Sequence, residues 1–273
     1  MSENNTLLIS EAFLSQQGEG NTTGVPSFFI RQKGCSLNCG LSNENLRFLL
    51  KNKDQANTGF KGDLEKEGKS TWTCDSAPVW LHGEATPFQV LVDKFRQENI
   101  YDWVRTGRVH LIWTGGEPTM PIHQQNAVNF VNWFKKQEAA PVSLYNEVET
   151  NGVHYMTNEF FYIINQINCS VKLSNSGMPA SRRIKPDALN RIIQHKNYWF
   201  KFVISNESDM EEIIKDFIEP FNIDWKRVIV MPGLDNREQY HERTHFIMET
   251  AKKYGVIGLN RLHISGYGAV TGV

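Results

Sequence analysis

Apolar strand-like runs alternate with helix-like segments along most of the chain, and this alternation limits the possible folds more than any other feature. Strands are expected at Leu7–Phe13, Ser27–Arg31, Val109–Thr114, Ser143–Glu149, Ser170–Leu173, Trp199–Ile204, Arg227–Met231 and Arg261–Ile264. Helices are expected at Pro87–Gln97, Gln124–Lys136, Pro186–Gln194, Glu211–Ile218 and Glu238–Tyr254. Such an order is typical of an α/β fold with a largely parallel sheet.

Polar motifs stand where several of these expected strands end. They are Thr114–Pro118, Glu149–Gly152, Ser174–Gly177 and Met231–Gly233. Ligands of parallel α/β folds bind at the carboxyl ends of the strands, so the sequence predicts a ligand site at that edge.

The segment 40–73 interrupts the alternation. Eleven of its 34 residues are charged, and we interpret it as an insertion. Leu46, Leu49 and Leu50 follow Asn43 at helical spacing, which predicts a short amphipathic helix in its first half.

The composition excludes some classes of function. The formal net charge is −1, so no basic surface for nucleic acid is expected. No apolar run is long enough to span a membrane, and the N-terminus does not resemble a signal peptide. We therefore expect a cytoplasmic protein, in which cysteines serve as ligands or free thiols more readily than as disulfides.

Three of the four cysteines have polar neighbours and are candidate metal ligands. Cys35 and Cys39 share one loop-like segment, and Cys74 lies further along, beside Asp75. Three thiolates would leave one iron of a four-iron cluster open to another ligand. Inert buried thiols and a zinc site are the alternatives that this pattern leaves open. The fourth, Cys169, is interpreted as a core thiol.

The run Gly115–Pro118 follows the expected strand at Val109–Thr114. Two glycines allow the backbone to approach a ligand closely, and the carboxylate of Glu117 could accept hydrogen bonds from a ligand ammonium. Alone the run is compatible with a plain turn. Together with the three cysteines it indicates an iron-sulfur cluster with an organic ligand beside it.

Taken in order, the motifs resemble those of the radical S-adenosylmethionine superfamily, and within it the 7-carboxy-7-deazaguanine synthases. The motifs are Gln17–Gly20, Phe29–Arg31, Gly34–Cys35, Trp72–Ser76, Thr114–Pro118, Glu149–Gly152, Ser170–Lys172, Lys201–Val203 and Leu262–His263. Three features depart from the family pattern: the long gap before Cys74, Ser76 in place of a threonine, and the tail Ser265–Val273.

The resemblance implies an α/β fold in the form of a modified partial (β/α) barrel of the radical SAM type. The chain would be a single domain over 1–273, with the insertion at about 40–73 after the second cysteine. The implied reaction is the radical ring contraction of 6-carboxy-5,6,7,8-tetrahydropterin to 7-carboxy-7-deazaguanine with loss of ammonia, a lyase reaction. Its product would serve queuosine or modified-DNA biosynthesis. The implied cofactors are a [4Fe-4S] cluster, S-adenosyl-L-methionine and Mg²⁺. A homodimer and an electron donor such as a flavodoxin are also implied.

The resemblance also assigns residues. Cys35, Cys39 and Cys74 would hold the cluster and Ser76 the magnesium ion. The cofactor would contact Gly116, Glu117, Glu149, Asn151, Ser170, Val171, Lys172, Met231 and Pro232. The pterin would contact Gln16, Gln17, Gly18, Arg31, Thr114 and His263. The expected catalytic residues are Arg31, Glu117 and His263. Arg31 and His263 would meet the carboxylate of the pterin, and a guanidinium suits this task because it can bind a carboxylate with two parallel hydrogen bonds.

Simpler roles stay open for several of these side chains. Glu149 could be a structural carboxylate, Arg31 a member of a surface ion pair, His263 a satisfied strand histidine and Ser76 a turn former. Two other functions stay open as well. One is another radical SAM enzyme, such as a glycyl-radical activating enzyme, and the other is a non-catalytic relative that binds a cluster or zinc.

Overall fold

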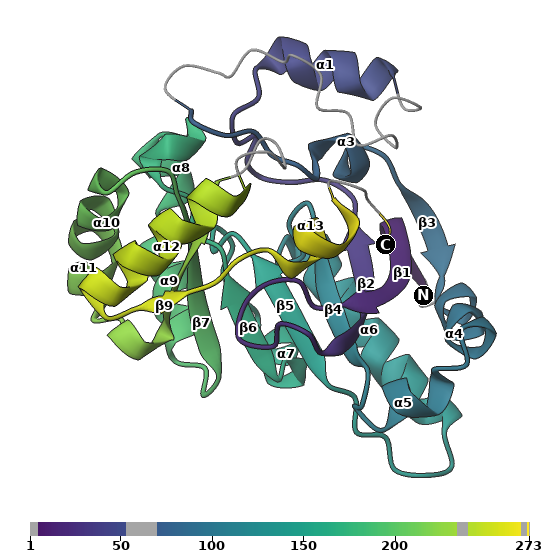
Figure 1. Cartoon of the computed structure of the whole chain (residues 1–273). Helices are drawn as coiled ribbons and strands as arrows, with labels where there is room; N and C mark the ends of the chain where they lie inside the picture. Colours follow the sequence, from purple (N-terminus) through teal and green to yellow (C-terminus); the bar gives the residue numbers. More distant parts are fainter. Residues whose placement is uncertain (1–4, 53–69, 234–239, 269–271, 273) are drawn as a thin grey trace.

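A single nine-stranded sheet organises the computed structural model, which describes residues 5–52, 70–233, 240–268 and 272 (Figure 1). The strands are β1 (Thr6–Gln16), β2 (Pro26–Gln32), β3 (Glu84–Pro87), β4 (His110–Gly115), β5 (Asn146–Thr150), β6 (Gln166–Cys169), β7 (Tyr198–Ile204), β8 (Val228–Pro232) and β9 (Ile257–Gly258). Their spatial order is β3-β1-β2-β4-β5-β6-β7-β8-β9. β1 pairs antiparallel with β2 and β3, and every pair from β2 to β9 is parallel. The expected α/β fold with a largely parallel sheet is confirmed.

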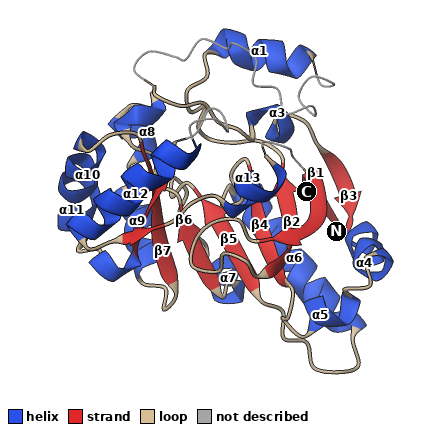
Figure 2. Ribbon diagram, in the orientation of Figure 1, coloured by secondary structure: helices blue, strands red, loops and turns tan. Residues whose placement is uncertain are grey.

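Helices connect successive strands and lie mostly outside the sheet (Figure 2). They are α1 (Asn43–Lys51), α3 (Ala77–Trp80), α4 (Phe88–Gln97), α5 (Tyr101–Arg105), α6 (Pro121–Gln137), α7 (Asn158–Ile163), α8 (Ala180–Arg183), α9 (Pro186–Ile193), α10 (Ser208–Ile213), α11 (Glu219–Phe221), α12 (Tyr240–Tyr254) and α13 (Leu262–Tyr267). Short 3-10 turns occupy Ser174–Ser176 and Trp225–Arg227, and a π-helical turn occupies Ile214–Ile218. Among the described helices, none has both the length and the apolar character that crossing a membrane requires.

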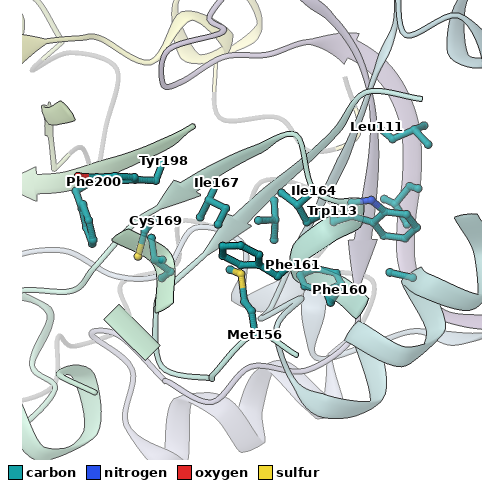
Figure 3. Packing of buried hydrophobic residues seen from close by; sticks show 14 of the residues in the cluster. Leu111, Trp113, Met156, Phe160, Phe161, Ile164, Ile167, Cys169, Tyr198 and Phe200 are labelled. Atoms are coloured by element: carbon teal, nitrogen blue, oxygen red, sulfur yellow. The ribbon is translucent and has the colours of Figure 1, made fainter. Parts of the chain in front are cut away.

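The main hydrophobic core lies between the sheet and the outer helices. β6 serves both faces of the sheet, because successive side chains of a strand point to opposite sides. Ile167 and Cys169 belong to the core, where Figure 3 shows them beside the aromatic rings of α7 and β7. Gln166 and Asn168, which alternate with them, are buried on the inner side. The interpretation of Cys169 as a core thiol is confirmed.

Two expected strands are wrong. The strand expected at Ser170–Leu173 lies four residues earlier, at Gln166–Cys169. Its inward side chains, Gln166 and Asn168, are polar although they are buried, so a hydrophobic pattern does not mark this strand. The strand expected at Arg261–Ile264 is instead the start of helix α13. There the chain leaves the sheet after the two residues of β9, and the amide of Leu262 donates to the carbonyl of Gly18, 2.9 Å away.

The first part of the inserted segment forms the expected helix. α1 begins after Ser42, whose side chain accepts a hydrogen bond from the amide of Asn45. Leu49 packs with Leu41 and Trp80 in a small cluster separate from the main core. Residues 53–69 of the insertion, and residues 238–239 of the helix expected at Glu238–Tyr254, lie outside the described residues.

Candidate active site

A cavity of about 310 Å³ lies on the inner side of the sheet, beside the carboxyl ends of the parallel strands. Helix α13 lies over this side (Figure 1). Of the site residues expected from the sequence, all but Glu117, Val171 and Pro232 line this one cavity. They are Gln16, Gln17, Gly18, Arg31, Cys35, Cys39, Cys74, Ser76, Thr114, Gly116, Glu149, Asn151, Ser170, Lys172, Met231 and His263. The fold therefore gathers residues from both ends of the chain around one space.

The backbone brings Cys74 back to Cys39 across the insertion. The amide of Cys74 donates to the carbonyl of Cys39 over 3.0 Å. Gly40 adopts a φ of +70°, and a Cβ there would lie 2.1 Å from the carbonyl oxygen of Trp72. Only glycine allows this approach. Through these two contacts the ends of the insertion meet directly beside the cysteines.

The three thiols share an apolar surrounding of Leu37, Trp72 and Met178. Burial raises the pKa of Cys35 above its ordinary value and that of Cys39 to about 12. Without a bound metal centre, Cys35 and Cys39 are therefore protonated, and binding of a metal centre would release their protons.

The described residues contain no group of three or more histidine, cysteine or acidic side chains arranged around a single metal ion. A cluster differs from a single ion because each of its cysteines binds a different iron, so the sulfurs need not converge on one point. The arrangement of the cysteines is therefore compatible with a cluster.

The glycine run after β4 packs directly against the cysteine loop. A Cβ on Gly116 would lie 1.6 Å from the carbonyl oxygen of Gly34, and the amide of Glu117 donates to that same oxygen over 2.9 Å. This close approach fixes the backbone leading into Cys35. The glycines therefore serve both the cavity and the loop that carries the first cysteine.

The carboxylate of Glu117, which was expected at the cofactor, does not line the cavity. It is 0% exposed. One oxygen accepts from the amide of Thr119 at 2.9 Å and from the hydroxyl of Thr150 at 2.6 Å, and the other accepts from the amide of Asn151 at 2.7 Å. A carboxylate bound in this way ties the end of β4 to the end of β5. Its expected contact with a ligand ammonium stays a prediction.

Two further residues expected at the cofactor do not line the cavity either. The side chain of Val171 is buried in the main core, and Pro232 is buried at the end of β8, opposite Ile204 of β7. Their neighbours do line it, and the ammonium of Lys172 donates to the hydroxyl of Ser170 over 2.9 Å. Ser170 and Lys172 thus form a polar part of this wall, and Met231 and Gly233 form an apolar part.

Arg31 and His263 both line the cavity, each with a specific support. The Nε of Arg31 pairs with Glu11 on the neighbouring strand at 3.0 Å, so the guanidinium is held in place. His263 packs against Gly18, where a Cβ would lie 2.1 Å from its Nδ1. Burial lowers the pKa of His263, which keeps the ring neutral near pH 7. It stands on helix α13 rather than on the expected strand.

A network of charged residues also borders the cavity, and Glu149 is its only member to which the sequence assigned a role. Lys201 pairs with Glu149 and, at 3.3 Å, with Glu19. Arg261 pairs with Glu19 at 2.7 Å and with Asp75. The network thus connects β7, the turn after β1, the segment next to Cys74 and the start of α13.

The network sets the ionisation of its members. Burial alone would raise the pKa of Glu19, but the nearby charges of Arg261 and Lys201 outweigh it and hold that pKa well below its ordinary range. Burial raises the pKa of Glu149 to about 7, and Lys201 only partly offsets this. The pKa of Lys201 is raised because Glu149 and Glu19 outweigh the cost of burying its charge.

No family model matches the chain. A 7-carboxy-7-deazaguanine synthase of Pyrobaculum aerophilum is 26% identical over 273 residues, which cover 100% of both chains. One of Halobacterium salinarum is 25% identical, with 95% of this chain and 90% of the relative covered. The chain is homologous to the 7-carboxy-7-deazaguanine synthases over its full length.

A solved structure shows the same fold. The crystal structure of QueE from Escherichia coli superposes with a TM-score of 0.58 at 20% identity, and the match covers 96% of this chain and 100% of that chain. The α/β fold with a mostly parallel, partly closed sheet is therefore that of QueE.

Ser76 stands where the synthase family was expected to bind magnesium. It lies at the start of α3, lines the cavity and places its hydroxyl 3.6 Å from the sulfur of Cys74. Its side chain makes no capping hydrogen bond to α3. The hydroxyl oxygen of Ser76 is therefore not used in capping α3, and it faces the same cavity as the cysteines.

Proposed function

We propose that this chain is a 7-carboxy-7-deazaguanine synthase. It would contract the ring of 6-carboxy-5,6,7,8-tetrahydropterin to 7-carboxy-7-deazaguanine, with loss of ammonia. Full-length homology to these radical SAM enzymes supports the family. The observation that carries the specific reaction is the cavity, which is lined by all of the expected cluster and pterin residues and by most of the expected cofactor residues.

The residues present fit a [4Fe-4S] cluster. Cys35, Cys39 and Cys74 would hold three irons and leave the fourth for the amino and carboxylate groups of S-adenosylmethionine. Gly116 lines the cavity, and its lack of a side chain lets the turn after β4 pack on the loop that carries Cys35. When bound, cluster and S-adenosylmethionine would supply the radical that removes a hydrogen atom from the pterin.

The remaining lining residues fit a small, polar, carboxylated substrate. Arg31 offers a guanidinium anchored on Glu11, and the neutral ring of His263 offers a hydrogen-bonding nitrogen. Gln17 donates to Glu149 over 3.1 Å, which orders the side chains that would face the pterin ring. Ser76 offers a hydroxyl oxygen to Mg²⁺, which accepts few protein ligands and keeps its waters.

Turnover by the anaerobically reconstituted protein tests the proposal. With S-adenosylmethionine, a reductant and Mg²⁺, we expect it to consume 6-carboxy-5,6,7,8-tetrahydropterin and to form 7-carboxy-7-deazaguanine and ammonia. Formation of 5′-deoxyadenosine without consumption of the pterin would instead indicate another radical SAM reaction. Purified protein that binds zinc without sulfide would support the non-catalytic alternative.

A further inference from the structure

The register of three parallel strands places a row of buried polar side chains behind the cavity. On the inner face Glu149 of β5 lies opposite Asn168 of β6, and Glu147 lies opposite Gln166. Asn168 in turn lies opposite Trp199 of β7. Asn168 and Glu147 are both 0% exposed, so each of their hydrogen bonds is made without competition from water.

These side chains form a hydrogen-bonded chain with a fixed direction. It starts at the indole of Trp199, which can only donate, and donates to Oδ1 of Asn197 over 3.0 Å. The amide nitrogen of Asn197 must then donate onward, to Oε1 of Gln166 at 3.1 Å. Gln166 donates in the same sense to Oδ1 of Asn168 at 3.0 Å. The direction of every amide is therefore set from one end.

The chain ends on the carboxylate that lines the cavity. With its oxygen engaged by Gln166, Asn168 directs its nitrogen toward two carboxylates: Oε1 of Glu149 at 3.1 Å and Oε2 of Glu147 at 3.0 Å. An amide nitrogen carries two hydrogens, one for each of these acceptors. Asn168 thus bridges two acidic groups that point the same way from one strand.

We propose that Asn168 is a positioning residue of the active site, which fixes the carboxylate of Glu149 toward the cavity and favours its ionised form. This inference rests on the proposed function for its catalytic consequence, but the bridge itself is independent of the reaction. A donor to the charged form of an acid lowers its pKa, so Asn168 counteracts the burial of Glu149.

Other charged groups also face Glu149, and they define what Asn168 alone contributes. The ammonium of Lys201 favours its ionised form, whereas the carboxylates of Glu19 and Glu147 oppose it. Asn168 contacts Glu147 as well as Glu149, so its loss would weaken the screening between the two carboxylates. Both effects act in the same direction, and removal of the amide is expected to raise the pKa of Glu149.

The direct test is a titration of Glu149 in the purified full-length chain. Infrared difference spectra against pH follow the carboxyl groups, and subtraction of the Glu149→Gln variant assigns the signal. In Asn168→Leu, which keeps the branched shape but removes the donor, we expect the pKa of Glu149 to rise by about one pH unit. An unchanged pKa would overturn the proposal.

Thr22→Val is the matched control. The hydroxyl of Thr22 donates to the same Oε2 of Glu147 at 2.8 Å but has no hydrogen bond to Glu149. We expect this variant to leave the pKa of Glu149 where it is in the unsubstituted chain. If both substitutions raise it equally, the effect passes through Glu147 and the positioning role of Asn168 is wrong.

A second variant covers the case in which Asn168→Leu does not fold. Asn168→Asp keeps the shape and replaces the donor by a third acid, so the pKa of Glu149 is expected to rise further than in the leucine variant. Absence of a rise would again overturn the proposal.

Turnover separates the two proposals. If the unsubstituted chain is active, the acidic limb of its pH-rate profile is expected to move upward in Asn168→Leu by the shift seen in the infrared titration, and a limb that stays in place would contradict the catalytic role. If the unsubstituted chain does not consume the pterin, the proposed function fails, whereas the titration still decides whether Asn168 controls Glu149.

Discussion

The position of Cys74 is determined by its backbone. Its amide bonds to Cys39, and the neighbouring Trp72 packs over Gly40 with no space for a side chain between them. Both contacts belong to residues next to the sulfurs, so the position of the third thiol does not depend on the residues in the middle of the insertion. The backbone of Cys74 is therefore held directly against the loop that carries Cys35 and Cys39.

Replacement of this thiol tests its role. In Cys74→Ala we expect anaerobic reconstitution to yield no intact four-iron cluster, because one iron would lose its protein ligand. Iron and sulfide analysis with electron paramagnetic resonance measures the result. Cys169→Ala is the control, since Cys169 is buried in the main core and should leave cluster content unchanged. A four-iron signal of normal intensity in Cys74→Ala would show that the ligand is misassigned.

A place at the cavity could be predicted for residues inside compact sequence motifs. It could not be predicted for residues whose role depends on an ion pair with a distant segment. Gly116 and Asn151 follow strand ends, and their neighbours in sequence point to a ligand. Lys201, by contrast, acquires its role only from Glu149 and Glu19, which lie on other segments. Glu117 belongs to a motif, but its hydrogen bonds to Thr119, Thr150 and Asn151 could not be predicted from its neighbours in sequence.

The helix α1 supports the cysteine region through a single buried side chain. Leu49 is 1% exposed and packs with Leu41 and Trp80, whereas Leu50 beside it is 49% exposed. The sequence pattern grouped both leucines with Leu46 as the apolar residues of the helix, whereas the structure buries Leu49 and exposes Leu50. The small cluster around Leu49 lies next to Cys35 and Cys74, which are packed against it.

A pair of alanine substitutions measures this support. Leu49→Ala is expected to lower the free energy of unfolding by about 2–3 kcal/mol, because it removes a fully buried side chain. Leu50→Ala is expected to change it by less than about 0.5 kcal/mol. Denaturant unfolding of both variants under identical conditions provides the comparison. Equal effects of the two substitutions would mean that α1 does not pack as described.

Element boundaries failed where the inner face of the sheet is polar. β6 reads as Gln166–Cys169, in which the two buried inward residues are a glutamine and an asparagine. A hydropathy pattern places a strand where apolar residues alternate, so it selected the following residues instead. The parallel strands with apolar inward residues, such as β8, were found at nearly their observed bounds.

On the scale of the whole molecule, one charged network joins segments that are far apart in sequence. Glu19 follows the first strand, Asp75 follows the third cysteine, and Arg261 precedes the last helix. Asp75 is 59% exposed, whereas Glu19 is largely buried between two cations. Glu19 is therefore the member whose charge matters most for holding these segments together.

Acid should weaken this connection. The pKa of Glu19 is lower in the folded protein than its ordinary value of 4.5, so its pairing stabilises the fold above about pH 4.5. That contribution is lost as the pH falls from there toward the folded pKa. We expect the melting temperature to drop over this range. Glu19→Gln should be less stable near pH 6 and should show a smaller drop, and an equal drop in both proteins would contradict the assignment.

The meeting of Cys39 and Cys74 also bears on how such proteins are recognised. A chain can grow or shrink between two points that already touch, because the entropy of closing a loop rises only slowly with its length. The number of residues between the second and third sulfurs can then vary while the relative position of the sulfurs stays constant. A search pattern that counts those residues would overlook this chain, whereas one that asks only for the glycine after the second cysteine and the Cys-Asp pair at the third would retain it.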